Sequence, residues 1–208
     1  MRREVRREMC ARYFLEESPE LRPYVEKMNR SPLLTMFPGA VAVTAGEVRP
    51  GNVSPVLATN RRGEAAVFPM RWGYGGKTLL INARSETAAM KPTFAESWAL
   101  RRCAVPASWY YEWLHLTDGQ GRVRTGEKYL FRFSETHALW MCGLYRMENG
   151  LPHYVILTRE AGESIRFIHN RMPLILPREA AEDWIRPDGK PEETAAAALT
   201  EPEFRKAV

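Results

Sequence analysis

Residues 138–158 read ALWMCGLYRMENGLPHYVILT and determine the fold class. Two runs in this stretch, 138–146 and 153–158, are rich in the branched and aromatic side chains that strands favour. Asn149-Gly150 lies between them and is a dipeptide typical of a tight turn. Runs of the same texture recur at 40–44, 53–58, 64–73, 77–81, 103–105, 109–114 and 128–133. The sequence therefore predicts a protein built mainly of short strands.

Helical patterns are fewer, and they are confined to 18–30, 93–101, 160–168, 178–186 and 192–199. Strands and helices do not alternate, which argues against a parallel sheet made of βαβ units. At 208 residues the chain is long enough for one sizeable domain. We therefore predict a single α+β domain with an antiparallel or mixed, barrel-like β core and peripheral helices.

The overall charge is only a weak indication of a nucleic-acid partner. The formal net charge is +5, but the first eight residues contribute four Arg and two Glu. From Met9 onward 26 Lys and Arg stand against 23 Asp and Glu, which leaves an excess of three. A mixed, solvated surface explains this balance at least as well as a nucleic-acid footprint does. Any claim of DNA binding must rest on particular residues.

Cysteine usage and hydropathy restrict the cell compartment and the cofactors. Cys10, Cys103 and Cys142 are odd in number, widely separated and without C-x-x-C spacing. This pattern argues against a disulfide framework and a structural zinc site, and we assign Cys103 and Cys142 to the core. The apolar stretches are short, and no signal-peptide pattern follows the N-terminal arginines. The sequence predicts a cytoplasmic, monomeric protein with no membrane contact, no metal and no organic cofactor.

The first segment that could carry chemistry is Met9-Cys10-Ala11-Arg12-Tyr13. If translation starts at Met9 and this methionine is removed, the α-amine and the thiol of Cys10 are both free. Such a residue can condense with an aldehyde and close a thiazolidine ring. The ordinary pKa values of thiols and α-amines, about 8.5 and about 7.7–8.0, leave both groups partly reactive near neutral pH. A cysteine is more often a small buried hydrophobe, and that interpretation stays open.

A second segment, Ile81-Asn82-Ala83-Arg84-Ser85-Glu86-Thr87, leaves a strand and enters a polar stretch. Asn82 and Arg84 would face the same way if the strand persists. An amide beside a guanidinium suits an anion or a phosphate. Ser85 or Thr87 could instead simply cap the following turn.

Three other polar positions are candidates for function. Glu112 lies in a strand-like run between aromatic residues, where desolvation disfavours its charged form. This makes Glu112 a candidate proton donor and acceptor. The alternative is a solvent-facing Glu on an edge strand. His169-Asn170-Arg171 precedes a proline at an element boundary, where functional residues often lie. Arg71 beside Trp72 could place a cation and a stacking plane next to an unpaired base, or Trp72 could be buried at a strand edge.

Taken together, five segments closely resemble the SRAP family, the SOS-response-associated peptidases or abasic-site processing proteins. They are Met9 to Tyr13, Met70 to Gly73, Asn82 to Thr87, Pro106 to Trp113 and His169 to Pro173. Their order and rough spacing match the family pattern from Met9 to about Trp184. The resemblance implies a β-rich fold with flanking helices and a positively charged channel for single-stranded DNA. It also implies a protein that traps the ring-opened aldehyde of an abasic site as a thiazolidine and so shields the lesion.

The resemblance also implies a role for individual residues. Cys10 would be the nucleophile, Asn82 would position it or the sugar, Glu112 would be the general acid and base, and His169 would assist the ring-opened sugar and the proton transfers. The implied DNA contacts are Arg12, Arg71, Trp72, Arg84, Ser85 and Arg171. Abasic-site lyase activity and self-cleavage are further activities that the resemblance suggests.

Three features depart from the family pattern. The residue after the cysteine is usually glycine and is Ala11 here, and Trp109 replaces a common glycine before Tyr-Tyr-Glu-Trp. The third departure is the leader 1–8, because an amide at Cys10 cannot form an imine. We predict that the leader is either a misassigned start or a propeptide removed by self-cleavage. The expected organisation is a leader at 1–8, an SRAP domain at 9–186 and a C-terminal tail at 187–208.

Two other functions remain open at this stage. One is a cysteine peptidase or hydrolase in which Cys10, His169 and Glu112 act as nucleophile, base and orienter. The other is a non-covalent single-stranded DNA-binding module that uses Arg71, Trp72 and Arg84. The first predicts turnover of peptides, and the second predicts that Cys10→Ser leaves DNA binding unchanged.

Overall fold

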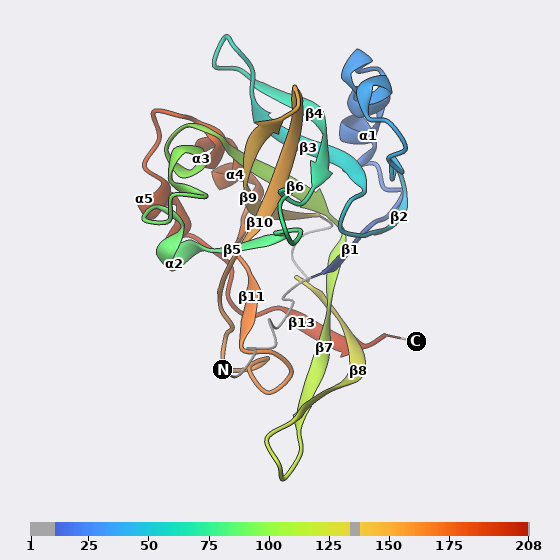
Figure 1. The fold of residues 1–208 in the computed structure, drawn as a ribbon, viewed down its shortest axis with the longest axis vertical. Coiled ribbons are helices and arrows are strands. Elements are labelled where there is room, and N and C mark those ends of the chain that lie inside the picture. The colour runs from blue at the N-terminus through green and yellow to red at the C-terminus, as the bar shows by residue number, and fades with distance from the viewer. Residues whose placement is uncertain (1–10, 134–137, 208) are drawn as a thin grey trace.

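The centre of the fold is a closed barrel of five strands, seen in a computed structural model that describes residues 11–133 and 138–207 (Figure 1). Its strands are β3 (Val53–Thr59), β4 (Ala65–Trp72), β6 (Arg102–Ala107), β9 (Leu139–Glu148) and β10 (Leu151–Glu160). Pairing runs from β10 to β4, β3, β6 and β9, and then back from β9 to β10. Only the contact between β10 and β4 is parallel, so the barrel is mixed. The predicted fold class is confirmed.

The β9–β10 hairpin forms where the sequence predicts it. Its turn residues Asn149 and Gly150 both have positive φ, +50° and +80°, and Glu148 pairs directly with Leu151. A two-residue turn with positive φ at both positions has the twist that antiparallel strands require, and Asn-Gly tolerates it best. The local turn chemistry therefore sets the register of the strand pair that closes the barrel.

Three short strands extend the barrel near the C-terminal end of β10. They are β5 (Asn82–Arg84), β11 (Arg171–Pro173) and β12 (Ile175–Leu176). β5 runs parallel to β10, with Asn82 opposite Ile156. β11 runs antiparallel to β10, with Arg171 opposite Glu160. Both of these strands pair with Thr158, so two segments more than 80 residues apart flank the same stretch of β10.

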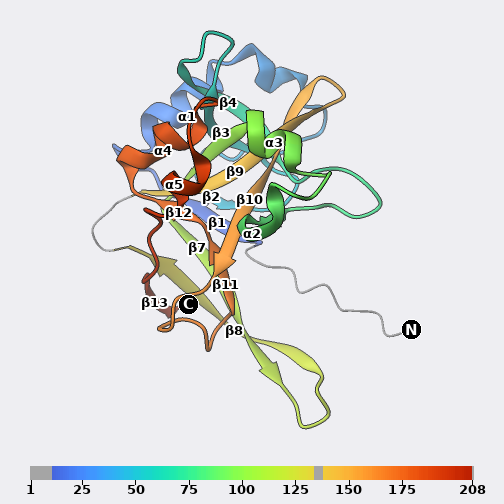
Figure 2. The same cartoon turned by 90° about the vertical axis from the view of Figure 1, so that its left-hand side faces the viewer.

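A second sheet lies below the barrel in Figure 1, and we call it the open sheet. Its order is β13 (Glu203–Lys206), β8 (Val123–Arg132), β7 (Trp109–Thr117), β1 (Arg12–Leu15) and β2 (Gly46–Val48). The β7–β8 hairpin projects away from the rest of the molecule in both views (Figures 1 and 2). Residues 203–206 of the expected C-terminal tail form β13 and pair with β8.

Helices flank the barrel on two sides (Figure 1). α1 (Arg22–Asn29) and the 3-10 helix η1 (Pro32–Met36) lie on one side. α2 (Ser85–Ala88), α3 (Ala95–Leu100), α4 (Arg178–Ile185) and α5 (Pro191–Ala195) lie on the other. Buried Arg102 ties α3 and α4 to β6, because its guanidinium donates to the carbonyl oxygens of Trp98 and Trp184. Carbonyl groups in the last turn of a helix have no partner within the helix, so they readily accept hydrogen bonds from a cation.

The core divides between the two sides of the barrel wall. One cluster contains Trp72, Cys103 and Tyr154 together with the core-facing residues of the open sheet. The other contains Cys142 and packs against Trp98 and Trp184 of the helices. Cys103 and Cys142 are both fully buried and reduced, which confirms their assignment to the core. Burial raises the pKa of both thiols.

Three expected elements do not form. Residues 40–44 have the alternation of a strand but contribute one isolated bridge, between Ala42 and Val53. Residues 77–81 contribute only the bridge from Leu80 to Tyr74. The helix expected over 160–168 does not form: residue 160 ends β10 and residues 163–168 are turns, because a short connection must return the chain to β11. Among the described residues, none of the helices is long and apolar enough to cross a membrane.

Candidate functional site

The open sheet has two chemically distinct faces. Arg12 is opposite Tyr111 and Tyr13 is opposite Tyr110, so residues 12 and 111 share one face and residues 13 and 110 share the other. Glu112 lies on the face of Tyr13 and Tyr110, which is the core side. Its side chain is only 3% exposed. The sequence prediction of a carboxyl group buried among aromatic residues is thus confirmed.

The hydrogen bonding of His169 suits a group that gains and loses a proton. The ring is 4% exposed, and its Nδ1 lies 3.0 Å from both the backbone nitrogen and the carbonyl oxygen of Arg171. A neutral Nδ1 accepts from the N–H, whereas a protonated Nδ1 can donate to the carbonyl oxygen. The same ring atom therefore has a hydrogen-bond partner in both tautomeric arrangements.

His115 connects β7 to this histidine. Its ring packs edge to face against His169 with 4.8 Å between centroids, and its backbone N–H donates to the carbonyl oxygen of Ile168. A bulge separates Trp113 from His115 in the β7–β8 pairing, and bulges redirect side chains in this way. The structure thus places His169 against the same strand that carries Glu112. The sequence pattern does not single out His115, and its position only three residues after Glu112 is the one available signal.

Asn82 lies at the start of β5 and is half-buried. The preceding residue, Ile81, accepts a hydrogen bond from the indole of Trp72 at 2.9 Å and another from the backbone of Ile156. These two contacts fix the backbone that presents Asn82. Trp72 is fully buried and stacks on Tyr154, so the expected stacking of Trp72 on a DNA base is not possible in this structure. Its role here is to support β5 from within the core.

Arg171 also has an internal role instead of a free cationic one. Its Nη1 and Nη2 donate to the two carboxylate oxygens of Glu86 at 2.7 and 2.8 Å, and Nη2 also donates to the carbonyl oxygen of Thr158 at 2.7 Å. Partial burial is the largest single influence and acts to raise the pKa of Glu86. The hydrogen bonds and charge of Arg171, together with backbone hydrogen bonds, outweigh it, so the pKa lies below its ordinary value. Arg171 therefore ties β11 and β10 to α2, and the expected DNA contact would require this ion pair to open.

The other expected DNA contacts differ in how exposed their side chains are and in whether those side chains are already paired. Arg84 is exposed, and its side chain has no ion-pair partner among residues 11–133 and 138–207. Ser85 follows it as the first residue of α2. Arg71 is half-buried, and its Nη2 is 3.4 Å from the carbonyl oxygen of Pro38. Arg12 is paired with Glu47 at 3.1 Å. Arg84 is therefore the best placed of these arginines to bind a phosphate.

Cys10 lies outside the described residues. The described chain nevertheless positions its neighbours, because β1 begins at Arg12 and Arg12 is opposite Tyr111, the residue before Glu112. Tyr13 anchors the same strand through a closed set of buried hydroxyl hydrogen bonds with Ser54 and Tyr154, all between 2.7 and 2.9 Å. This set cannot be predicted from local sequence because its members are far apart in the chain.

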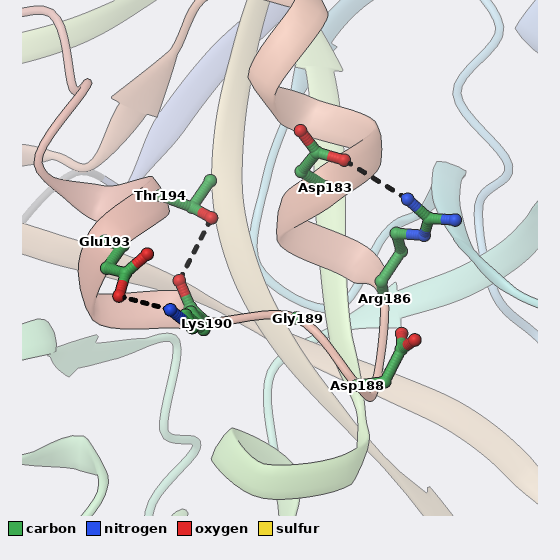
Figure 3. Close-up of a pocket in the computed structure, with 7 residues that line it drawn as sticks. All are labelled: Asp183, Arg186, Asp188, Gly189, Lys190, Glu193 and Thr194. Carbon is green, nitrogen blue, oxygen red and sulfur yellow. Dashed lines mark hydrogen bonds and ion pairs between the residues drawn. The ribbon is translucent and has the colours of Figure 1, made fainter.

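A charged pocket lies elsewhere, between α4 and α5 (Figure 3). It has a volume of about 330 Å³ and is lined by Asp183, Arg186, Asp188, Gly189, Lys190, Glu193 and Thr194. Its charges pair with one another, Lys190 with Glu193 at 2.8 Å and Arg186 with Asp183 at 3.5 Å. None of the expected site residues lines it. Within the part of the chain that the structure describes, no cluster of His, Cys, Asp or Glu could hold a metal ion.

Comparison with known proteins identifies the family. The family model described as SOS response associated peptidase (SRAP) matches residues 9–207. This chain belongs to the SRAP family. It is 33% identical to the abasic site processing protein YoaM of Bacillus subtilis over 162 residues, which cover 68% of each chain. It is 27% identical to the abasic site processing protein YedK of Escherichia coli, over 72% of this chain and 70% of that one.

Other relatives and solved structures extend this picture. YoqW of B. subtilis, also called an abasic site processing protein, is 34% identical, but the match spans 52% of this chain and only 48% of that protein. The SRAP fold of this chain superposes on a phage-related protein of Bordetella bronchiseptica with a TM-score of 0.71 and 24% identity, covering 95% and 94% of the two chains. A protein from Bacteroides thetaiotaomicron gives a TM-score of 0.70 at 20% identity, over 95% and 91%.

Proposed function

We propose that this SRAP protein processes abasic sites in single-stranded DNA by forming a covalent crosslink through Cys10. The observation that carries the proposal is the pairing of β1 with β7. This pairing brings the segment that follows Cys10 beside Glu112, a buried carboxyl group, while His169 packs against the same strand. The names of three relatives, all abasic site processing proteins, support the substrate class.

The proposed reaction has two bond-forming steps. The α-amine of Cys10 attacks the aldehyde carbon of the ring-opened sugar, and the resulting carbinolamine loses water to give an imine. The thiol then adds to the imine carbon, and its proton ends on the nitrogen, so that the net products are a thiazolidine and one water. Proton transfer is needed at the departing oxygen and at the nitrogen, and a buried acid–base group is suited to this work.

Glu112 and His169 divide these proton transfers in our proposal. Glu112 protonates the departing hydroxyl group, and His169 holds the opened sugar and exchanges a proton through its ring. The Nδ1 contacts of His169 support this role, because the ring keeps a hydrogen bond whether it is charged or neutral. Asn82 positions the sugar from β5. The imine is also the intermediate from which strand cleavage by elimination would start, so weak lyase activity is part of the proposal.

Binding to the DNA strand is proposed to depend on the backbone and not on sequence. The proposed phosphate contacts are Arg84 at the end of β5, Ser85 at the start of α2, the half-buried Arg71, and Arg12 on the open sheet. Contacts to phosphates give affinity without sequence preference and make it salt-dependent. A covalent product removes the need for tight initial binding, which is compatible with an excess of only three positive charges from Met9 onward.

The proposal requires a free α-amine at Cys10. We propose that the active form begins at Cys10, after a start at Met9 or after self-cleavage of residues 1–8. The family match supports this arrangement because it begins at residue 9. A protein that keeps residues 1–8 has an amide at this position, and an amide nitrogen does not form an imine.

One assay tests the proposed function. The protein expressed from Met9 is incubated with single-stranded oligonucleotides that contain an abasic site or an intact base, and the products are separated on a denaturing gel. We expect a heat-stable shifted band only with the abasic oligonucleotide, no band with Cys10→Ala, and a rate about 10² lower with Glu112→Gln. A shifted band with Cys10→Ala, or equal shifts with intact DNA, would refute the covalent mechanism.

A further inference from the structure

Four charged side chains meet on the outer face of the open sheet, and we call them the Glu47 cluster. The Glu47 carboxylate lies 3.1 Å from Nε of Arg12, 2.9 Å from Nε of Arg49 and 2.8 Å from Nζ of Lys128. Arg12 comes from β1, Glu47 from β2 and Lys128 from β8, while Arg49 directly follows β2. The cluster thus spans the sheet on the face opposite Glu112.

Aromatic rings form the floor of this cluster. Nζ of Lys128 is 3.7 Å from the ring centroid of Tyr111 and 5.5 Å from that of Trp113. Beside it, Phe14 stacks on Trp109 with the rings 4.4 Å apart and nearly parallel. A cation over an aromatic face is attracted by the ring quadrupole but keeps its full charge, so it can still bind an anion.

The Glu47 cluster contains three cations and one carboxylate. The side chains of Arg12, Glu47 and Lys128 are 28%, 22% and 30% exposed, so all three can be reached from solvent. Burial acts to raise the pKa of Glu47, but the hydrogen bond from Lys128 and the neighbouring cations outweigh it and lower the pKa. The carboxylate is therefore ionised at neutral pH and occupies the position between the cations that a phosphate would take.

We propose that Glu47 is an internal competitor of the DNA backbone, and that Lys128 and Arg49 extend the proposed phosphate contact at Arg12 into a larger phosphodiester-binding site. This inference rests on the proposed binding of single-stranded DNA at Arg12. When a strand binds, a phosphate displaces the Glu47 carboxylate from Lys128 and Arg12. The half-buried indole of Trp113 beside them offers a stacking surface to a base. Without DNA, the carboxylate holds the same cations and restrains non-specific binding.

The sign of one substitution distinguishes this idea from a structural role. If Glu47 competes with phosphate, Glu47→Gln removes the competitor and adds one net positive charge, so affinity for a single strand rises. If Glu47 instead holds the cations in the geometry that binds DNA, Glu47→Gln lowers affinity. Two unit charges about 4 Å apart in water interact with an energy of about 1 kcal/mol, which corresponds to a change in Kd of about fivefold.

The test measures non-covalent binding of an undamaged, fluorescein-labelled single-stranded oligonucleotide by anisotropy at several salt concentrations. We expect Glu47→Gln to tighten Kd about fivefold at low salt and to steepen the salt dependence by about 0.7 in the log–log slope, the value for one phosphate of a single strand. Lys128→Met keeps an apolar stem over Tyr111 and is expected to weaken binding and flatten the slope by the same amount.

Glu193→Gln is the matched control, because Glu193 also pairs with a lysine at 2.8 Å, on α5 and in the pocket of Figure 3. It should change Kd less than twofold. Thermal unfolding of each variant establishes that it is folded. Unchanged or weaker binding by folded Glu47→Gln, or unchanged binding by Lys128→Met, would overturn the inference. The abasic-site crosslink is scored separately, so its loss would count against the proposed function and not against this site.

Discussion

The ion pair between Arg171 and Glu86 gives the sharpest test of how the site is held together. The sequence resemblance implies a DNA contact for Arg171, whereas the structure shows its guanidinium bound to both oxygens of Glu86 and to the carbonyl oxygen of Thr158. The Arg171 side chain is 8% exposed and that of Glu86 is 44% exposed. An internal tie predicts loss of stability on substitution, and a DNA contact predicts loss of affinity alone.

The magnitude follows from the contacts that are lost. Arg171→Met removes two charge-assisted hydrogen bonds to Glu86 and leaves the Thr158 carbonyl without its donor. Such bonds contribute about 1.5–3 kcal/mol each when buried, but Glu86 is partly solvated and can hydrate after the change. We therefore expect a net loss of about 2 kcal/mol, which corresponds to a fall in Tm of about 4–8 °C for a domain of this size.

A double-mutant cycle measures the tie directly. Glu86→Gln alone should cost about 1–2 kcal/mol, and the pair Arg171→Met with Glu86→Gln should cost about 1–2 kcal/mol less than the sum of the single changes. Arg84→Gln is the control, because this exposed arginine of β5 should lose DNA affinity without a change in Tm. Urea unfolding supplies the free energies, and anisotropy supplies the affinities. If the two single changes are additive, or if Arg171→Met has the wild-type Tm, the Arg171–Glu86 ion pair does not stabilise the fold and the prediction is refuted.

Three further predictions concern pH, thiol chemistry and the barrel turn. The pKa of Glu86 is lower in the folded protein than its ordinary value of 4.5. The stability that ionised Glu86 gives the folded state is therefore complete above pH 4.5 and is lost as the pH falls through the folded pKa. As the pH is decreased, the Tm of Glu86→Gln should fall less than that of the wild type. Because Cys103 and Cys142 are fully buried, a Cys10→Ala protein should give no fast reaction with a thiol reagent until denaturant is added. Gly150 has φ of +80°, so Gly150→Val should lower stability by about 1–2 kcal/mol in urea unfolding, and an unchanged midpoint would contradict the turn assignment.

Much of the β architecture could be predicted from local sequence. The runs at 53–58, 64–73 and 138–146 became β3, β4 and β9 within a few residues of the expected bounds, because alternation and turn residues act over short distances. The pattern at 40–44 is equally alternating but did not form a strand, since only Ala42 finds a partner, in Val53. A strand needs a neighbour to bond with, and local sequence does not specify that neighbour.

The candidate site was predicted in part. The burial of Glu112 followed from its position among aromatic residues, and His169 followed from its place at an element boundary. The expectations for Trp72 and Arg171 were incomplete, because the residues that engage their side chains are distant in the chain or in other elements. Trp72 is enclosed by the core, and Arg171 pairs with a glutamate 85 residues away. A solvent-facing arginine and an internally paired one look the same in sequence.

The amino-acid sequence by itself determined the strand-forming runs, the tight turn at Asn149-Gly150 and the residue types available for chemistry. Only the tertiary structure decided that β10 and β9 close a barrel, that β1 lies beside β7, and that Glu47 rather than solvent holds Arg12 and Lys128. The physical reason is the range of the interactions. Backbone propensity and turn geometry act between neighbouring residues, whereas burial and charge pairing depend on which distant segments the folded chain brings into contact.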